Sequence, residues 1–522
     1  MRQLLLLIFA LIGIACVSEK ATVVSAADEP QTQSPTTTVQ GFTAVEGADL
    51  MAKLEAAQTR ARARQTPYWS AYTFDVRPGV GVDPVIREFN GTMNTIGDTT
   101  VVIGTTANGM TVETRNLAIF LLRDPTSNQI TRMEVYNLER KREYSGYPVY
   151  WLGRANNEES LNYLRAIAAA TPLDMLSERA VLSIALHDDS RVAGMLKNFV
   201  ETSPNQRIRS TSVYWLGHVG GEQTFLASLV RNESEDKKIR RSAAHAIGRS
   251  RDRGTVATLQ GLYENVKDPE VRRGVISAIG DSVDQQPAFA FLLTVAKNDT
   301  DWESRRAAVR EVGNFQREDA ADELMKIYNN EANLEVKRAA LRALGDTKNP
   351  RAHARLLEIS RNESNKELRK TAIRALADRG EAAVDDLLKL FDAETTPDVK
   401  RTILQSLSDI KSTRVEDKLF AVASGNDATD VRRQAIRLLG ERVGKRSFDF
   451  LSQTAQSPTA DAEVQVQAVR AISERRSEES VPLLIKIAKT HPNQLVRKQA
   501  IRSLGESGDP RAVEFFREVL SK

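Results

Sequence analysis

Between about residue 144 and the C-terminus the sequence repeats itself every 31 to 33 residues, and this period restricts the possible folds more than any local propensity. Each repeat is marked by a residue, called the anchor below, that is usually aliphatic and usually precedes an Arg. The twelve anchors are Tyr144, Leu176, Ile208, Ile239, Val271, Ser304, Val336, Leu368, Val399, Val431, Val464 and Val496. Eight positions beyond every anchor stands another aliphatic residue, such as Leu152 or Leu504. The pattern predicts an array of similar units.

Each anchor lies in a predicted amphipathic helix of about three turns. At 100° per residue the anchor and positions +1, +4, +5 and +8 form one apolar arc, whereas +2, +3 and +6 face the other way. N-cap residues stand three positions before most anchors: Asn205, Asp236, Asp268, Asp301, Asn333, Asn365, Thr396, Asp461 and Asn493. Pro269 and Pro397 follow their caps at the first helical position. Glycines nine positions past the anchor are predicted to end the helix: Gly153, Gly217, Gly248, Gly280, Gly313, Gly345, Gly440 and Gly505.

A second apolar-periodic segment, for example 351–359 or 513–520, separates successive anchor helices, so each repeat is predicted to be a helical hairpin. One hairpin cannot bury both of its apolar faces, and neighbouring hairpins must therefore stack. The runs Asp268-Pro269-Glu270-Val271-Arg272-Arg273 and Asp430-Val431-Arg432-Arg433, each followed by an aliphatic residue and Gly, resemble HEAT repeats of the short bacterial type named after phycobilisome lyases.

The resemblance implies a mainly α fold, a right-handed α-α superhelix of the HEAT/ARM type, with about twelve units over residues 144–522. It also implies that the anchor helices line the concave side and that Asp and Arg residues form a hydrogen-bond ladder between repeats. The arginines at position +1 match that ladder, and we expect their guanidinium groups to pair with the helix caps: Arg209, Arg240, Arg272, Arg305, Arg369, Arg432 and Arg497.

Residues 46–143 are predicted to form a short helix and a small antiparallel β module. The helix is expected over 49–64, where arginines gather near the C-terminal end. Asn108-Gly109 between β-branched runs predicts one hairpin, and the turn formers of 124–128 predict a second.

The N-terminus reads as an export signal, because Arg2 precedes an apolar run from Leu4 to Val17. We expect a signal peptide over residues 1–26 with cleavage after Ala26; the alternative is lipid attachment at Cys16, the only cysteine. Residues 27–45 have almost no large apolar groups and are predicted to be a flexible tether. Both routes place the protein outside the cytosol, in the periplasm or beyond the cell, with membrane contact only through a lipid anchor at Cys16.

A basic ridge is predicted on the exposed side of the anchor helices, because positions +2 and +6 lie four residues apart on one face. Its residues are Arg241, Arg273, Arg306, Arg310, Arg338, Arg342, Lys370, Arg374, Arg401, Arg433, Arg437, Arg470, Lys498 and Arg502. A ridge of this kind is explained either by solubility or by an acidic partner.

Two similar aromatic runs, around Tyr150-Trp151 and Tyr214-Trp215, lie where the ridge stops. The rings are expected to pack against the β module; a ligand or partner pocket is the alternative.

Catalysis finds no support in the sequence, which has no Walker loop, no Gly-x-Ser-x-Gly turn and no Cys/His metal spacing. None of the five histidines is followed by Glu, so the paired motif of HEAT-like hydroxylases is missing as well. The sequence thus favours a monomeric, non-catalytic protein-binding scaffold of the bacterial cell envelope without a cofactor, and no specific nucleic acid is expected. Two alternatives stay open: an enzyme of the bilin lyase or hydroxylase type, and a salt-sensitive polyanion-binding protein.

Overall fold

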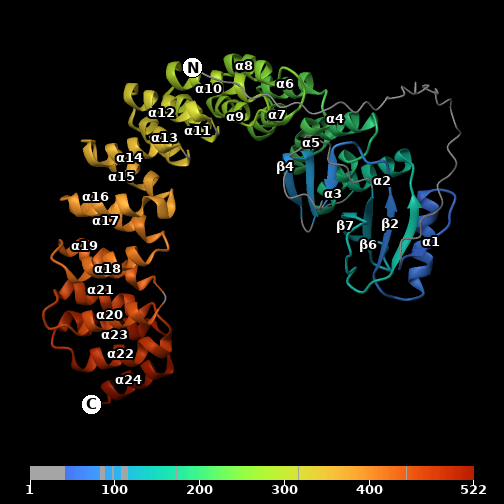
Figure 1. Cartoon of the computed structure of the whole chain (residues 1–522). Coiled ribbons are helices and arrows are strands. Elements are labelled where there is room, and N and C mark those ends of the chain that lie inside the picture. Colours follow the sequence, from blue (N-terminus) through green and yellow to red (C-terminus); the bar gives the residue numbers. More distant parts are fainter. Residues whose placement is uncertain are drawn as a thin grey trace, which may run out of the picture. The chain divides into compact units, whose positions relative to one another are not determined.

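The computed structural model describes residues 41–82, 89–96, 99–106, 116–170, 174–315, 317–347, 349–442 and 444–521 (Figure 1). The predicted signal peptide, Cys16, most of the tether and the Asn108-Gly109 turn lie outside these residues. The chain divides into two compact units, each described by itself. Unit 1 comprises Met1–Thr73, Phe120–Thr131 and Arg142–Ala155, and unit 2 comprises Phe74–Ile119, Arg132–Lys141 and Asn156–Lys522.

The β module contains a five-stranded sheet whose strand order is β1-β8-β2-β6-β7. The strands are β1 (Thr43–Ala44), β2 (Tyr68–Thr73), β6 (Leu117–Arg123), β7 (Ile130–Asn137) and β8 (Val149–Arg154). Both β1 and β2 run parallel to β8, so the prediction of a purely antiparallel module is wrong. Parallel neighbours need long connections, and alternation along a strand does not reveal which distant strand it will join. Residues 43 and 44, which were predicted to belong to the flexible tether, form strand β1 instead.

Two local predictions in this region are confirmed. Helix α1 (Leu50–Arg62) begins at Asp49, whose carboxylate accepts the N–H of Ala52 at 2.8 Å. Strands β6 and β7 are neighbours joined through a turn in which Asp124 accepts the N–H of Ser127 at 2.7 Å. A separate antiparallel sheet has the order β3-β5-β4, from β3 (Val80–Val82), β4 (Phe89–Ile96) and β5 (Thr99–Thr106).

The solenoid begins later than predicted. Residues 149–154, assigned from the sequence to the first anchor helix, form strand β8 instead, because their large aromatic side chains are buried within the sheet. The described residues contain eleven anchor helices rather than twelve. They are α3 (Asp174–Ala185), α5 (Gln206–Val219), α7 (Lys237–Arg249), α9 (Pro269–Gly280), α11 (Trp302–Asn314), α13 (Leu334–Asp346), α15 (Lys366–Ala377), α17 (Pro397–Ser408), α19 (Thr429–Gly440), α21 (Ala462–Ser473) and α23 (Gln494–Glu506).

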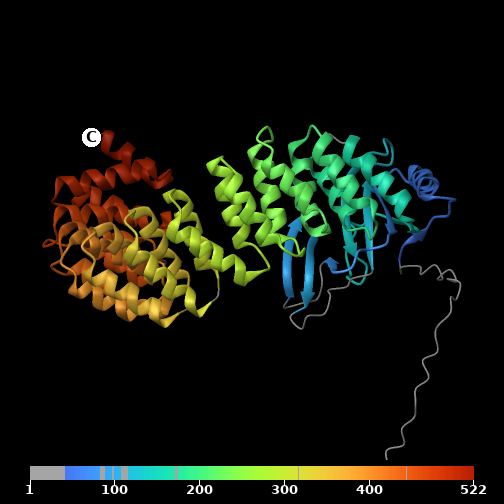
Figure 2. The same ribbon diagram turned by 90° about the horizontal axis from the view of Figure 1, so that it is seen from above.

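One intervening helix precedes the first anchor helix, one lies between each consecutive pair, and one follows the last. Consecutive hairpins lie side by side in chain order (Figures 1 and 2). The intervening helices are α2 (Asn157–Ala170), α4 (Arg191–Thr202), α6 (Gln223–Arg231), α8 (Thr255–Asn265), α10 (Gln285–Asn298), α12 (Glu318–Asn330), α14 (Pro350–Asn362), α16 (Val384–Ala393), α18 (Thr413–Ser424), α20 (Lys445–Gln456), α22 (Ser477–Thr490) and α24 (Pro510–Leu520). A short 3-10 turn, Gly380–Ala383, precedes α16.

The core of the solenoid is the apolar arc that the period predicted. From Ile184 to Leu504, every aliphatic residue eight positions past an anchor is at most 1% exposed. Most predicted caps are confirmed: Asn333, for example, accepts the N–H of Glu335 at 2.8 Å. Thr396 and Asp461 precede their helices without a side-chain cap bond.

Among the glycines at position +9, only Gly280 and Gly440 are the last residues of their helices, so the prediction that these glycines end the helix is wrong at the other positions. Gly248 lies inside α7, and a Cβ added there would stand 2.1 Å from the carbonyl oxygen of Ala278 on α9. The same close approach occurs at Gly217, Gly313, Gly345 and Gly440, each against position +7 of the next anchor helix. These glycines and their partners, called the glycine seam below, let successive anchor helices pack closely. Gly153, also predicted to be a stop, lies in β8 with φ +75°.

Candidate binding surface on the anchor helices

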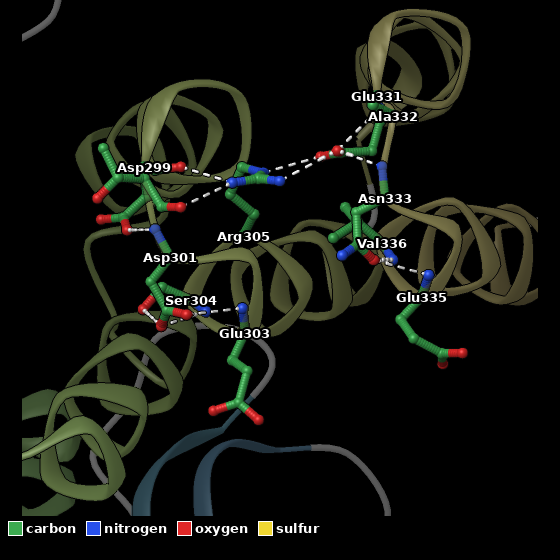
Figure 3. Close-up of polar contacts among 11 residues, drawn as sticks. Asp299, Asp301, Glu303, Ser304, Arg305, Glu331, Ala332, Asn333, Glu335 and Val336 are labelled. Atoms are coloured by element: carbon green, nitrogen blue, oxygen red, sulfur yellow. Dashed lines mark hydrogen bonds and ion pairs between the residues drawn. The ribbon is translucent and has the colours of Figure 1, made fainter.

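In several repeats an arginine at position +1 joins the repeat to the next one, and Arg305 on α11 shows the arrangement (Figure 3). Its Nε and Nη2 donate to the two carboxylate oxygens of Glu331, at 2.8 and 3.1 Å, and its Nη1 donates to the carbonyl of Asp299 at 2.8 Å. Glu331 in turn accepts the N–H of Asn333 at 2.8 Å. Because Asn333 caps α13, the bidentate pair fixes the start of one anchor helix against the body of the previous one.

The charge of Glu331 is stabilised by these contacts. Burial acts to raise the pKa of this carboxyl, but the hydrogen bonds from Arg305 and the backbone more than offset it, so the pKa lies below its usual value.

The ladder between repeats, implied by the resemblance to HEAT repeats, is therefore present. Comparable pairs are Arg209–Glu235, Arg272–Asp299, Arg369–Glu394 and Arg432–Asp461. The expected partners were the helix caps, and this detail is wrong except at Asp461. Most of these acids stand four or five residues before the next anchor, and several arginines also donate to the end of the helix that precedes their own, as Arg240 does to the carbonyl of Val230 at 2.9 Å.

Eight of the fourteen residues of the predicted basic ridge stand at position +2, and six of these form a second ladder. In this ladder each cation meets the acid that directly precedes the anchor of the next repeat. The pairs are Arg241–Glu270, Arg273–Glu303, Arg338–Glu367, Lys370–Asp398, Arg401–Asp430 and Arg433–Glu463. Arg306 lies over the ring of Trp302 at 5.1 Å, and Lys498 is exposed. Their carboxylate partners neutralise most of the +2 row. The signal for this was present in the sequence, since Glu or Asp stands immediately before most anchors.

The residues at position +6 are of two kinds. In the C-terminal repeats Arg437 donates to Gln405 and Glu441, Arg470 to Gln499 at 3.2 Å, and Arg502 to Glu506 at 3.0 Å. In the central repeats the arginines at this position, Arg310, Arg342 and Arg374, are exposed. We call these three the arginine row.

The arginine row is nearly without internal partners. Arg342 and Arg374 have no hydrogen bond or ion pair to any residue that the structure describes. Arg310 has one loose ion pair, 3.8 Å to Glu311, and its side chain is 69% exposed. Arg470 is held by position +3 of the next repeat, where the central helices carry Ala339, Thr371 and Thr402 instead of glutamine, whereas Arg437 and Arg502 each have a glutamate at +10 of their own helix.

An acidic row runs one helical turn beyond the arginine row. Burial and the neighbouring like charge raise the pKa of Asp346 and of Asp378 above their usual values. Among the residues that the structure describes, no ion pair or side-chain hydrogen bond joins Asp346 to Arg342 or Asp378 to Arg374.

The predicted aromatic zone is divided between strand β8 and helix α5. Tyr150 and Trp151 are buried in β8, where Tyr150 meets the ring of Tyr68 edge-on at 5.6 Å. Trp215 is buried in α5 and Tyr214 is half-buried beside His218. Burial and nearby arginines lower the pKa of His218 to about 4. Three of the four rings are thus core residues.

A groove of about 720 Å³ lies between α2 and the α4–α5 loop and is lined by Asn162, Arg165, Asn198 and Asn205 among others. Among all the residues that the structure describes, no three His, Cys, Asp or Glu side chains are placed to share a metal ion. Nor does any described helix have the length and apolar character needed to cross a bilayer.

The fold and surface define an α-solenoid built from stacked helical hairpins. A family model for HEAT repeats matches residues 223–302, 289–377, 353–440, 384–462 and 448–522, which together are more than half of the chain. The chain belongs to the HEAT-repeat family.

Several solved structures are similar to this chain at low identity and low TM-score. A mutant of Kap121p is 12% identical with a TM-score of 0.35, over 67% of this chain and 45% of that one. YibA from Escherichia coli is 17% identical with a TM-score of 0.30, over 48% of this chain and 90% of that one. Kap95p, from a study of its binding to RanGDP, is 13% identical with a TM-score of 0.35, over 67% and 50%. The chain thus spans about half the length of the two Kap proteins. No curated protein sequence matches it.

Proposed function

We propose that the chain is a non-catalytic scaffold that binds a protein partner along the exposed face of its anchor helices. One observation carries the proposal: successive repeats present equivalent side chains at equal intervals, on helices that two ladders and a glycine seam hold in register. The result is an extended, pre-organised surface, and such a surface loses little entropy when it binds a long partner.

The anchor layer is also the more closely packed of the two helix layers. A stack bends toward the layer whose helices are closer together, so this face is the inner one wherever the solenoid curves. That geometry supports the assignment of the partner to the anchor helices rather than to the intervening helices.

Photo-crosslinking tests the proposal. A photoreactive amino acid replaces Arg342 on α13 in one variant and Arg351, an exposed residue of α14, in the other. Both variants are irradiated in intact cells of the native host. We expect a discrete crosslinked product from the variant at position 342 and none from the variant at position 351. Equal products from both helix layers, or products from α14 alone, would contradict the assignment.

The cellular location belongs to the same proposal. An export signal over residues 1–26 supports a place in the periplasm or beyond the cell, with the tether linking unit 1 to a lipid only if Cys16 is modified. Intact mass of the protein from the native host distinguishes cleavage after Ala26 from a diacylglyceryl group on Cys16. A cytosolic protein that keeps Met1 would refute export.

A further inference from the structure

We infer that the arginine row binds an extended acidic segment of a partner protein, one carrying a carboxylate at every third residue. The inference rests on the proposed scaffold function and narrows it to a place, helices α11, α13 and α15, and to one class of ligand.

The first observation is that the guanidinium groups of this row are available. Arg342 and Arg374 are exposed and bond to no described residue, whereas Arg437, Arg470 and Arg502 at equivalent positions are held by Gln or Glu. Guanidinium groups form bidentate, charge-assisted bonds with carboxylates, and the ladder pair Arg305–Glu331 shows that geometry within this same chain. The exposed arginines can offer the same bonds to an external carboxylate.

The second observation concerns the width of the site. Toward the N-terminal end of each helix the row is bordered by the +2 ladder, in which Arg338 and Lys370 are already paired with acids. Toward the C-terminal end it is bordered by Asp346 and Asp378, about 6 Å away at 1.5 Å per residue. A broad polyanion such as a nucleic-acid duplex would overlie these aspartates and be repelled. A single extended chain fits between the two borders.

The third observation is the spacing. Packed helices lie about 8–10 Å apart, so consecutive guanidinium groups of the row are about one such interval apart. In a polyproline II segment, with 3 residues per turn and a rise of about 3.1 Å, every third side chain points the same way at intervals of about 9 Å. The backbone of such a segment needs no hydrogen-bond partner from the surface, and between the arginines Ala339 and Thr371 are small and buried, leaving room for it.

Fluorescence anisotropy on the purified full chain tests the inference with two labelled peptides of identical composition. The first repeats Glu-Pro-Ala five times; the second gathers the five Glu residues at one end. At about 0.15 M salt, the spaced peptide is expected to bind at least tenfold more tightly. Equal affinity for the two, or no binding of the spaced peptide at millimolar concentration, would overturn the inference.

A matched pair of variants locates the site. Arg342→Ala with Arg374→Ala removes two charges from the row, and Arg437→Ala with Arg502→Ala removes two charges from the same position in other repeats. The first pair should weaken binding of the spaced peptide at least tenfold and the second by less than twofold. Equal losses would show that only net charge matters, and tighter binding of a heparin fragment than of the peptide would indicate a polyanion site.

These outcomes separate the inference from the function on which it rests. A crosslink from position 342 together with failure of the peptides would support the scaffold proposal and exclude the acidic ligand. Failure of both experiments removes the scaffold proposal itself.

Discussion

The central repeats around α11, α13 and α15 and the C-terminal repeats around α19, α21 and α23 are built on one plan but treat their surfaces differently. Both sets carry paired +1 arginines, as in Arg305–Glu331 and Arg432–Asp461. In the C-terminal set, glutamines at +3 and glutamates at +10 occupy the +6 arginines; in the central set these arginines stay exposed. The difference teaches that repeats that stack in the same way can differ in whether the arginine at position +6 is paired or exposed.

The largest expected effect is a difference in stability between a variant of the +1 ladder and a variant of the arginine row. Arg305→Ala leaves the buried carboxylate of Glu331, 8% exposed, without its bidentate partner, and we expect a loss of about 3 kcal/mol in the free energy of unfolding. Arg342→Ala, at position +6 of the next repeat, should change the free energy of unfolding by less than about 0.5 kcal/mol. Urea unfolding measured by circular dichroism gives both values. Similar losses in the two variants would mean that the arginine row is structural.

The glycine seam provides the next contrast. A Cβ at Gly345 would lie 2.8 Å from the carbonyl oxygen of Ala375, so Gly345→Ala should destabilise the protein by about 1–2 kcal/mol. At Gly505 the nearest atom is Phe516 Cζ at 4.0 Å, and Gly505→Ala should stabilise by about 0.5 kcal/mol through helix propensity. Melting temperatures should move in opposite directions. A shift of the same sign in both would refute the close-packing role of these glycines.

A smaller effect should distinguish the two kinds of +6 arginine. Arg437→Ala removes bonds to Gln405 and Glu441 and should lower stability by about 0.5 kcal/mol, as is usual for surface pairs. A double-mutant cycle of Arg437 with Glu441 is expected to show coupling, and a cycle of Arg342 with Asp346 none. Measurable coupling in the second cycle would mean that Arg342 is occupied in solution.

The smallest effect concerns pH. Burial and the charge of Asp409 raise the pKa of Asp378 in the folded state. In the pH window between the unfolded and the folded pKa, the folded protein therefore holds a proton that the unfolded chain has released. Stability therefore falls as pH rises through this window, and Asp378→Asn should be more stable than the parent by a few tenths of a kcal/mol at pH 7. The gain should vanish below about pH 3.8, where the carboxyl is protonated in both states.

The matched variant of that prediction lies in the C-terminal repeats. Glu506→Gln removes the partner of Arg502 and should lower stability or leave it unchanged at pH 7. A gain of equal size in both variants would show that general charge repulsion, not the unpaired acidic row, is responsible.

Much of this protein could be predicted locally. The period, the apolar arc, the caps and Pro269 at its helix start depend on contacts within one or two turns, so the sequence alone predicts them correctly from Leu176 onward. The prediction of a helix around Tyr150 is wrong, because a run with the spacing of a repeat can also form a buried strand. The parallel partners of this strand lie far away in the sequence.

The sequence by itself determined that the chain is a solenoid of helical hairpins. The repeats recur about every 32 residues, and the apolar residues within each repeat recur with the helical period of 3.6. Only the tertiary structure decided which charges meet. The partners of Arg305 and Arg338 stand 26 and 29 residues away, and their pairing depends on the offset between adjacent helices, which the glycine seam sets. That offset is a property of packed helices and not of any one helix, so the availability of Arg342 and Arg374 became visible only in three dimensions.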